Sequence, residues 1–391
     1  MKRCWSKKEG MSGRYRMRMD GEVDRLSGLQ DDIVLKILSF VGLKDAIGTS
    51  LLSSRWRFIW TSIPHLDFST KDFSTMDKFS DFVTHVLSRR DNQVRLSSLK
   101  LYIHGKDGQD LARRIVNYAI SLNVQQLNVT CLFENDTNFF EDGIGFPLSL
   151  PSSHTLKHLT LSGSFHYDHF KLTSTPKLSS LTTLHLDCIT FYDGFFSMCP
   201  NLENLTLNQC KMMGLEVLRI SHPRLSNLTL DNGYTDLESV NVVTPQLKHL
   251  TILGFSGTYL ISAPELASFF IRGYSHYTFS TDGFRYLEKA QLSLRIICRS
   301  HVPKILSLLQ KLHNVKHLSL CMEIIKFLNL SMRVISHQPS PFGNLKSVKI
   351  FPKYSCSWTQ EYTKVIVSPE VKNYLLNSSP KATLTEVLLE Q

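Results

Sequence analysis

One apolar motif recurs at a nearly constant spacing through the middle of this chain. The motif has the form L-x-x-L-x-L, and its clearest copies begin at Leu156, Leu181, Leu202, Leu225 and Leu247, in steps of 25, 21, 23 and 22 residues. Apolar residues on alternate positions predict a short strand with one buried face. A single unit of this size cannot bury its own apolar face, so the repetition predicts that successive units stack into an elongated array.

Weaker copies extend the array in both directions. They begin at Leu96, Leu127, Leu266, Val315 and Leu345. Proline stands two residues before the first Leu in four repeats, at Pro200, Pro223, Pro245 and Pro264. The motif and a period of about 20–29 residues are those of leucine-rich repeats. We therefore predict an α/β fold with a leucine-rich-repeat solenoid built on a curved parallel sheet over residues 96–350.

Polar side chains occupy the positions between the buried leucines. They should lie on the exposed, concave face of the sheet, because successive strand residues point to opposite faces. We predict target-binding roles for His158, Thr160, His185, Asn204, Thr206, Asn227, Thr229, His249, Thr251 and Phe270. A polar, nearly uncharged surface with one aromatic ring suits a protein partner better than a phosphate backbone. Each Thr could instead be present only because it favours strands.

A different pattern precedes the repeats, over residues 23–64. Ile33, Ile37 and Leu38 recur at helical spacing, and we expect this helix to end at Gly42. A second helix is expected from about Lys44 to Leu52, and a third from Ser53 or Ser54, with Trp56 and Trp60, to Pro64. Three short helices are too few for a stable isolated core. Either a partner or the rest of the chain must cover their surplus apolar surface.

This N-terminal segment resembles the F-box in its plant form. The family pattern opens with Asp-Arg-Leu/Ile-Ser, continues with Leu-Pro-Asp-Asp-x-Leu-x-x-Ile-Leu-Ser and ends with Ser-x-Leu-Ser-x-Arg-Trp-Arg-x-x-Trp. The matching residues are Asp24, Arg25, Leu26, Leu29, Asp31, Asp32, Leu35, Ile37, Leu38, Ser39, Asp45, Ala46, Ser50, Leu52, Ser53, Arg55, Trp56, Arg57 and Trp60.

The resemblance implies partners and contact residues. An F-box docks on the Skp-type adaptor of a ubiquitin ligase, and through that adaptor on cullin and RING subunits. The residues that we expect to contact the adaptor are Leu26, Leu29, Gln30, Ile33, Ile37, Leu38, Leu52, Trp56 and Trp60.

Two positions depart from the family pattern. Gln30 stands where the family usually has Pro, and Gly42 replaces another frequent Pro. Proline restricts the unbound loop, so its loss should raise the entropic cost of docking. We expect a weakened adaptor contact.

The remaining segments complete the predicted organisation. Residues 1–22 form a basic tail that we expect to be disordered, and residues 65–95 are expected to be linker helices. Residues 351–391 resemble the terminal domain that follows the repeats in many plant F-box proteins, and should cap the solenoid. Val371, Tyr374 and Leu375 predict a helix there.

The sequence shows no pattern for catalysis or for a cofactor. It contains no phosphate loop, nucleophile elbow, zinc-protease helix or C-x-x-C pair. The two histidines of His166-Tyr-Asp-His169 could hold a metal, but a surface loop is the simpler reading. We therefore predict a protein that is not an enzyme and that needs neither cofactor nor metal.

Charge and hydropathy limit the other partners. The net charge is +10, and residues 1–18 alone hold seven Lys/Arg against one acid, or +6. The repeats are therefore not a basic nucleic-acid surface, and nucleic acid is not an expected partner. Because the sequence has no secretory signal and no long apolar run, we expect the nucleus or cytoplasm and no membrane.

Three hypotheses on function follow. The first is the substrate-recognition subunit of a Skp–cullin–F-box ubiquitin ligase, whose repeats bind a target protein. The second is a non-ligase interaction scaffold with a degenerate F-box, in which Gln30 has disabled docking. The third adds a small molecule that holds the target in place, although no residue of the concave row marks a pocket for it.

Overall fold

The computed structural model describes most of the chain, with interruptions. The described residues are 28–52, 54–132, 146–164, 170–212, 217–231, 239–254, 257–274, 277–281, 283–295, 301–352 and 366–386. The chain divides into two units, Met1–Ile63 and Pro64–Gln391, and each is described by itself. The expected basic tail, Leu26 and the loop with His166 and His169 lie outside the described residues.

The described residues of the first unit form two α-helices and two short 3₁₀ helices. Their bounds are α1 Asp31–Leu38, α2 Leu43–Gly48, η1 Thr49–Leu51 and η2 Ile59–Ser62. The expected third α-helix is instead a series of turns over residues 54–58 followed by η2. Trp56, Phe58 and Trp60 crowd this segment, and aromatic residues lose side-chain freedom in an α-helix. A 3₁₀ turn accommodates such a short piece.

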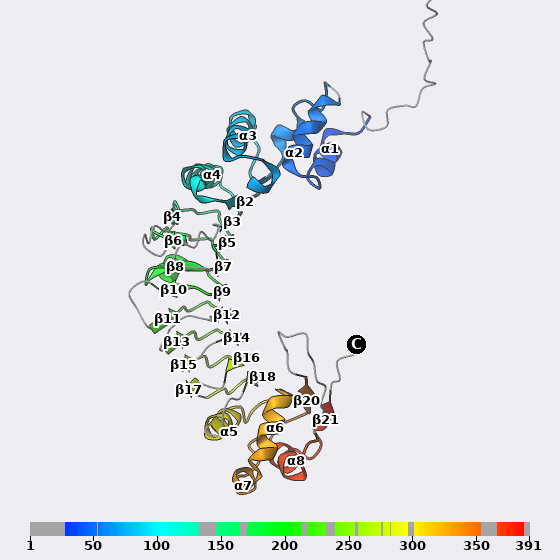
Figure 1. The fold of residues 1–391 in the computed structure, drawn as a ribbon, viewed down its shortest axis with the longest axis vertical. Helices are drawn as coiled ribbons and strands as arrows, with labels where there is room; N and C mark the ends of the chain where they lie inside the picture. Colours follow the sequence, from blue (N-terminus) through cyan, green and yellow to red (C-terminus); the bar gives the residue numbers. More distant parts are fainter. Residues whose placement is uncertain are drawn as a thin grey trace, which may run out of the picture. The chain divides into compact units, whose positions relative to one another are not determined.

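The second unit is built on one long parallel sheet (Figure 1). Its strand order is β1-β2-β3-β5-β7-β9-β12-β14-β16-β18-β19-β20-β21, and every neighbouring pair is parallel. The bounds are β1 His65–Ser69, β2 Ser98–His104, β3 Gln126–Leu132, β5 His158–Ser162, β7 Thr183–Asp187, β9 Asn204–Asn208, β12 Asn227–Asp231, β14 His249–Leu253, β16 Ser268–Tyr274, β18 Lys289–Arg295, β19 His317–Cys321, β20 Ser347–Phe351 and β21 Thr383–Glu386.

A second layer covers one face of this sheet and leaves the other face open (Figure 1). In the middle of the unit it consists of two small parallel sheets, ordered β10-β8-β6-β4 and β11-β13-β15-β17. Their bounds are β4 Phe146–Leu148, β6 Phe170–Leu172, β8 Ile189–Phe191, β10 Lys211–Met212, β11 Val217–Ser221, β13 Ser239–Val243, β15 Gly257–Ser262 and β17 Tyr277–Thr281.

Helices replace the small sheets at both ends of the unit. At the first end they are η3 Thr70–Asp72, α3 Met76–Arg89, η4 Lys106–Gly108 and α4 Gln109–Ser121. Within the repeats lies η5 Phe195–Met198, and at the last end are α5 Val302–Lys311, α6 Met322–Leu330, α7 Met332–Ile335 and α8 Pro369–Leu376. Among the described residues, none of the helices combines the length and apolar character that crossing a bilayer demands.

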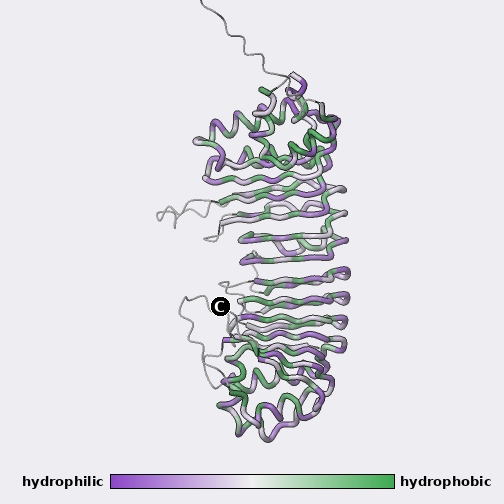
Figure 2. Tube along the Cα trace, turned by 90° about the vertical axis from the view of Figure 1, so that its right-hand side faces the viewer, coloured by the Kyte–Doolittle hydropathy of each residue, from purple (hydrophilic) through white to green (hydrophobic). Residues whose placement is uncertain are grey.

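The core lies between the layers and is made of aligned leucines. Leu159, Leu184, Leu205, Leu228 and Leu250 pair in register across five successive strands, and none is more than 2% exposed. Figure 2 shows the resulting alternation of apolar and polar positions along the strands. Fully burying one such side chain is worth about 1.5–3 kcal/mol. The predicted α/β fold, an N-terminal helical unit followed by a solenoid built on a long parallel sheet, is confirmed.

Both ends of the predicted array differ from expectation. Residues 65–95, expected as linker helices, contain β1 and α3 and form the first repeat of the sheet. Leu66 and Phe68 are the buried residues of β1, so this strand has alternation but lacks the Leu triplet. Within 351–391, α8 buries Val371 and Leu375 as expected, and β21 adds a further strand to the sheet.

A buried histidine occupies the turn before one repeat. The Nε2 atom of His222 lies 3.0 Å from the Cys199 carbonyl oxygen, and Nδ1 accepts a hydrogen bond of 3.3 Å from the Arg224 amide. Because that amide can only donate, Nδ1 carries no proton and the ring is neutral. Burial lowers the pKa of His222, against the opposing effect of the bond to the Cys199 carbonyl.

We predict that His222 makes the fold less stable in mild acid. Its folded-state pKa lies below the unfolded value of about 6.5, so its contribution is complete above that pH and is lost as the pH falls toward the folded pKa. The thermal unfolding midpoint of the full chain should therefore fall more between about pH 7.5 and 5.5 than that of His222→Gln. Parallel pH curves for the two proteins, measured by differential scanning calorimetry, would contradict this.

Candidate functional site

Helix α1 has one buried face and one exposed apolar face. Val34 and Leu38 are buried, at 0% and 2% exposure, whereas Ile33 and Ile37 are 42% and 41% exposed. Residues four apart lie on the same side of a helix, so each pair forms its own stripe. Helix α1 and helix α2 both pack against η2, which closes the buried side. The second stripe is left to solvent.

Further large apolar side chains of the same unit are exposed. Phe40 is 81% exposed, Leu51 90%, Leu52 73% and Phe58 66%. We use the name apolar set for Ile33, Ile37, Phe40, Val41, Leu51, Leu52 and Phe58. Exposed apolar residues concentrated in so small a unit make it a candidate interaction surface, because their contact with water costs free energy that a partner would recover.

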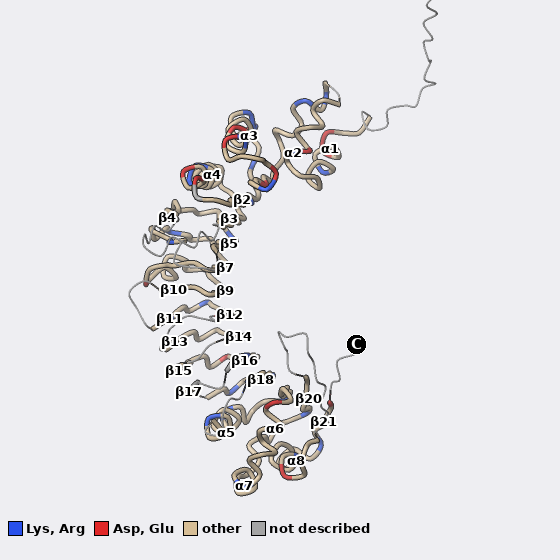
Figure 3. The backbone as a smooth tube through the Cα atoms, viewed as in Figure 1, with Lys and Arg blue, Asp and Glu red and all other residues tan. Residues whose placement is uncertain are grey.

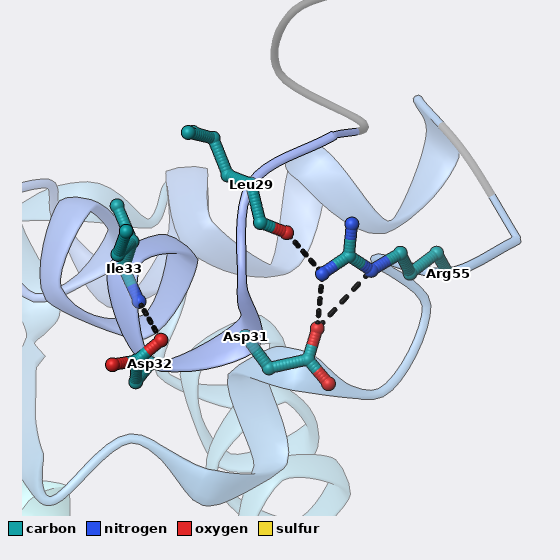
Figure 4. Close-up of polar contacts among 5 residues, drawn as sticks. All are labelled: Leu29, Asp31, Asp32, Ile33 and Arg55. Atoms are coloured by element: carbon teal, nitrogen blue, oxygen red, sulfur yellow. Dashed lines mark hydrogen bonds and ion pairs between the residues drawn. The ribbon is translucent and has the colours of Figure 1, made fainter.

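An arginine holds the segment that leads into α1 (Figure 4). The guanidinium of Arg55 forms an ion pair of 2.6 Å with Asp31 and donates a hydrogen bond to the carbonyl oxygen of Leu29. The neighbouring Asp32 carboxylate accepts a 2.9 Å bond from the amide of Ile33. Arg55 thus connects the residues before α1 to the turns that follow η1. This fixes the backbone beside the exposed stripe of α1.

The structure divides the predicted adaptor residues into two groups. Ile33, Ile37, Leu52 and Gln30 are exposed, and Leu29 is half-buried. The other three described residues are inside: Leu38, Trp56 and Trp60 are 2%, 6% and 5% exposed. They cannot present their side chains to a partner, so we reassign them from the contact surface to the core. The indole of Trp60 donates a 3.1 Å bond to the Arg57 carbonyl oxygen.

Several exposed residues were not among those predicted. Phe40, Val41, Leu51 and Phe58 belong to the apolar set, and Arg55 fixes the segment before α1. The sequence contained a pattern that could have indicated Phe40 and Val41. They follow Ile37 at the helical spacings of three and four residues. Leu51 and Phe58 lie outside α-helical segments, where no periodicity indicates exposure.

A second candidate surface is the open face of the long sheet. Its central row runs through the residues Asp67, Lys100, Asn128, Thr160, His185, Thr206, Thr229, Thr251, Phe270, Gln291, Ser319, Lys349 and Thr385, all paired in register. All ten predicted target-binding residues lie on this row or on the row two residues before it. His158 and His249 are exposed and the other eight are half-buried.

Polar side chains of neighbouring strands bond to one another on this face. Asn227 donates a 2.6 Å bond to Asn204, and Asn204 donates a 3.4 Å bond to Thr183. At the far ends of the strands, Asn208 donates a 2.7 Å bond to Asp187. These bonds hold the amides in place before any partner arrives, which reduces the side-chain entropy lost on binding.

Four cysteines of the described residues are unreactive because they are buried or half-buried. Burial raises the pKa values of the Cys131, Cys188, Cys199 and Cys210 thiols to about 12. A thiol must lose its proton to act as a nucleophile, so these four are inert near neutral pH. Within the described ranges, no three His, Cys, Asp or Glu side chains gather in a way that could hold a metal ion.

Comparison with known proteins places an F-box in the first unit and finds relatives that extend over much of the chain. Residues 26–67 match the family model described as F-box domain. An F-box/LRR-repeat protein of Arabidopsis thaliana is 30% identical over 278 residues, which are 68% of this chain and 84% of that protein. A second F-box/LRR-repeat protein and an F-box/FBD/LRR-repeat protein of the same plant are each 30% identical over 59% and 66% of this chain. This chain spans 65% and 57% of their lengths.

Truncating two adjacent residues of α1 should cost very different amounts of stability. Leu38→Ala leaves a cavity in the small core and should cost about 2–5 kcal/mol of the unit's stability. Ile37→Ala removes a side chain that is already half in water and should cost less than about 1 kcal/mol. Hydrogen exchange of residues 31–63 in the full chain measures the loss of stability in both variants. Equal loss of protection in the two variants would show that Ile37 belongs to the core.

Proposed function

From the premise that this chain belongs to the plant F-box/leucine-rich-repeat family, we propose that it is the substrate-recognition subunit of a Skp–cullin–F-box ubiquitin ligase. The F-box docks on a Skp-type adaptor, and through it on cullin and RING subunits. The open face of the long sheet binds a target protein. The chain supplies no catalytic group and acts by bringing the target close to the charged ubiquitin carrier.

The apolar set carries the adaptor part of the proposal. Ile33 and Ile37 form a stripe on α1 that no described part of the first unit covers, and Leu51 and Leu52 add apolar surface after α2. Burying these exposed apolar side chains against a partner would remove them from water, which favours binding. The Arg55 link to Asp31 and Leu29 holds the entry to α1 in a fixed conformation for docking.

The open sheet face supports the target part. Its central row is continuous over thirteen strands, since every pair of neighbours is in register. The hydroxyl, amide and imidazole groups on it can donate and accept hydrogen bonds, and Phe270 adds an aromatic contact. The backbone of the sheet does not need to move to present them.

Charge placed on the exposed stripe of α1 should abolish adaptor binding. The full chain carrying Ile33→Asp and Ile37→Asp, co-expressed with a Skp-type adaptor and purified, should lose the adaptor. Each carboxylate would lose water on docking without gaining a partner. Binding measured by isothermal titration should weaken at least about a hundredfold, since buried unpaired charges cost several kcal/mol.

The matched control adds the same charge elsewhere. Thr84→Asp and Ser307→Asp lie on exposed positions of α3 and α5 and should leave adaptor binding unchanged. If the unaltered chain recovers neither adaptor nor cullin, the proposal fails and the chain is a scaffold. If the α1 variant retains the adaptor, the exposed stripe is not the docking surface.

Restoring the family proline should strengthen docking. Gln30 already has φ of −69° and an extended ψ of 153°, which a proline ring accepts without strain. Gln30→Pro therefore reduces the freedom of the unbound loop and should tighten adaptor binding about two- to fivefold, the equivalent of about 0.4–1 kcal/mol. Gln30→Ala is the control, because it removes the same side chain without restricting the backbone. Unchanged affinity in Gln30→Pro would reject the entropic account.

A further inference from the structure

A pocket of about 410 Å³ lies beside the first strands of the long sheet, where β1 and β2 end. Two of its residues, Tyr102 and His104, stand at outward positions of β2, so the pocket adjoins the open face. The segment from η3 to the start of α3 supplies the rest (Figure 1). We use the name β2 pocket for the cavity lined by Thr70, Lys71, Phe73, Ser74, Thr75, Met76, Tyr102 and His104.

Part of the wall of the β2 pocket is apolar. The ring of Phe73 packs against the rings of Phe79 and Phe82, with centroids 5.5 and 5.0 Å away, so it is held in place. Phe73, Met76 and Tyr102 are each half-buried, which leaves part of their apolar surface in contact with water. An apolar group that enters the pocket would remove this surface from water, and that favours binding.

Hydroxyl groups of the β2 pocket provide hydrogen-bond donors. The hydroxyl oxygen of Thr70 accepts a bond of 3.0 Å from the backbone amide of His104. Lys78 donates to the other two hydroxyls, from its ammonium group to Ser74 at 3.1 Å and from its backbone amide to Thr75 at 3.3 Å. A hydroxyl that accepts in this way still has its own O–H to donate. Three such donors suit a ligand group that only accepts, and an ionised carboxylate is such a group.

Lys71 adds a positive charge to these donors. Its ammonium group lies 4.2 Å from the centre of the Tyr102 ring. The face of a ring attracts a cation without cancelling its charge, so the same ammonium can also contact an anion. The neighbouring Asp72 is exposed, has contacts of its own and does not line the pocket. The residues that do line it include a lysine and a histidine and no acid.

We propose that the β2 pocket binds the C-terminal residue of the target polypeptide. This inference rests on the proposed function, because it assigns a chemistry to the partner of the open face. The last residue of a chain carries a main-chain carboxylate beside its own side chain, so an apolar C-terminal residue matches both parts of the pocket. The carboxylate accepts hydrogen bonds from Lys71 and the hydroxyls, and the side chain packs on Phe73 and Met76.

The size and openness of the β2 pocket favour a polypeptide end over other anions. A water molecule takes about 30 Å³ in the liquid, so 410 Å³ is far more than an inorganic ion fills. Sites for small organic molecules cover most of the ligand surface, whereas this pocket is more open than enclosed. A C-terminal residue needs no full cover, because the residues before it can continue along the outward rows. Strand β1 is the edge of the sheet, so a chain that crosses the strands toward β1 ends beside the pocket.

Fluorescence anisotropy with defined probes tests the proposal on the full chain purified with its adaptor. The probes are labelled Gly/Ser peptides that end in Leu, Phe or Val, each made with a free C-terminal carboxylate and with a C-terminal amide. At least one free-acid peptide should bind. Its amide should bind at least about tenfold more weakly, since it loses the charge-assisted hydrogen bonds. Unlabelled N-acetyl-leucine should compete with the free-acid peptide, and inorganic phosphate should not.

Two substitutions with matched controls locate the binding to the β2 pocket. Ser74→Trp fills the cavity with an indole and should abolish binding, whereas Ser88→Trp, at an exposed position of α3 outside the pocket, should not. Lys71→Met should weaken binding about three- to fivefold, the range of an exposed ion pair. Lys177→Met removes the same charge at an exposed position outside the pocket and should change the affinity by less than about twofold.

The proposal is overturned if no free-acid peptide binds, if acid and amide bind equally, or if the two tryptophan variants bind alike. Binding of N-acetyl-leucine without any peptide would assign the pocket to a small organic acid. Displacement of the peptides by inorganic phosphate would assign it to a phosphoryl group, and either result also overturns the proposal. Adaptor recovery, measured in the same preparations, reports on the proposed function alone: a chain that keeps its adaptor but ignores the free-acid peptides refutes only the present inference.

Discussion

In-register stacking of apolar rows is the constraint on which the second unit depends. Most strands bury two or three side chains, and only alignment with the strands on either side removes them from water. A shift of one residue would turn every buried leucine to solvent. Helices close the array at both ends of the covered layer, because an unpaired terminal repeat would leave its apolar face exposed. The uniform outward rows are a consequence of this alignment.

The sequence predicted the parts of the fold whose side chains carry the period. Strands β5, β7, β9, β12, β14 and β16 of the long sheet follow the Leu triplets closely, because each triplet can bury its leucines only as a strand. Strand β1 was missed since its buried pair is Leu66 and Phe68, an alternation too short to stand out. Strand β21 has one apolar residue, Leu384, at an inward position, and it forms because β20 offers an edge to pair with. These two strands are determined by tertiary contacts.

The location of the candidate site in the N-terminal segment was predictable from the sequence, but which of its side chains are exposed was not. Helical spacing placed Ile33 and Leu38 together on an apolar segment, but spacing alone does not say which stripe faces inward. The choice depends on η2, which packs on the side of Val34 and Leu38. Trp56 and Trp60 are part of the family pattern, yet they are buried and belong to the core of the first unit. A shared motif residue can belong to the fold of a docking unit as well as to its contact.

The two units differ in how their exposed side chains affect the stability of the fold. The first unit leaves apolar side chains in water, and this costs stability that a partner covering them would restore. The open face of the long sheet exposes polar groups, and their contact with water costs no stability in the unbound chain. Substitutions at such positions usually change stability by less than about 0.5 kcal/mol. The outward rows can therefore acquire acids at Asp187 and cations at Lys289 without disturbing the leucines beneath, and the choice of partner is separated from the ability to fold.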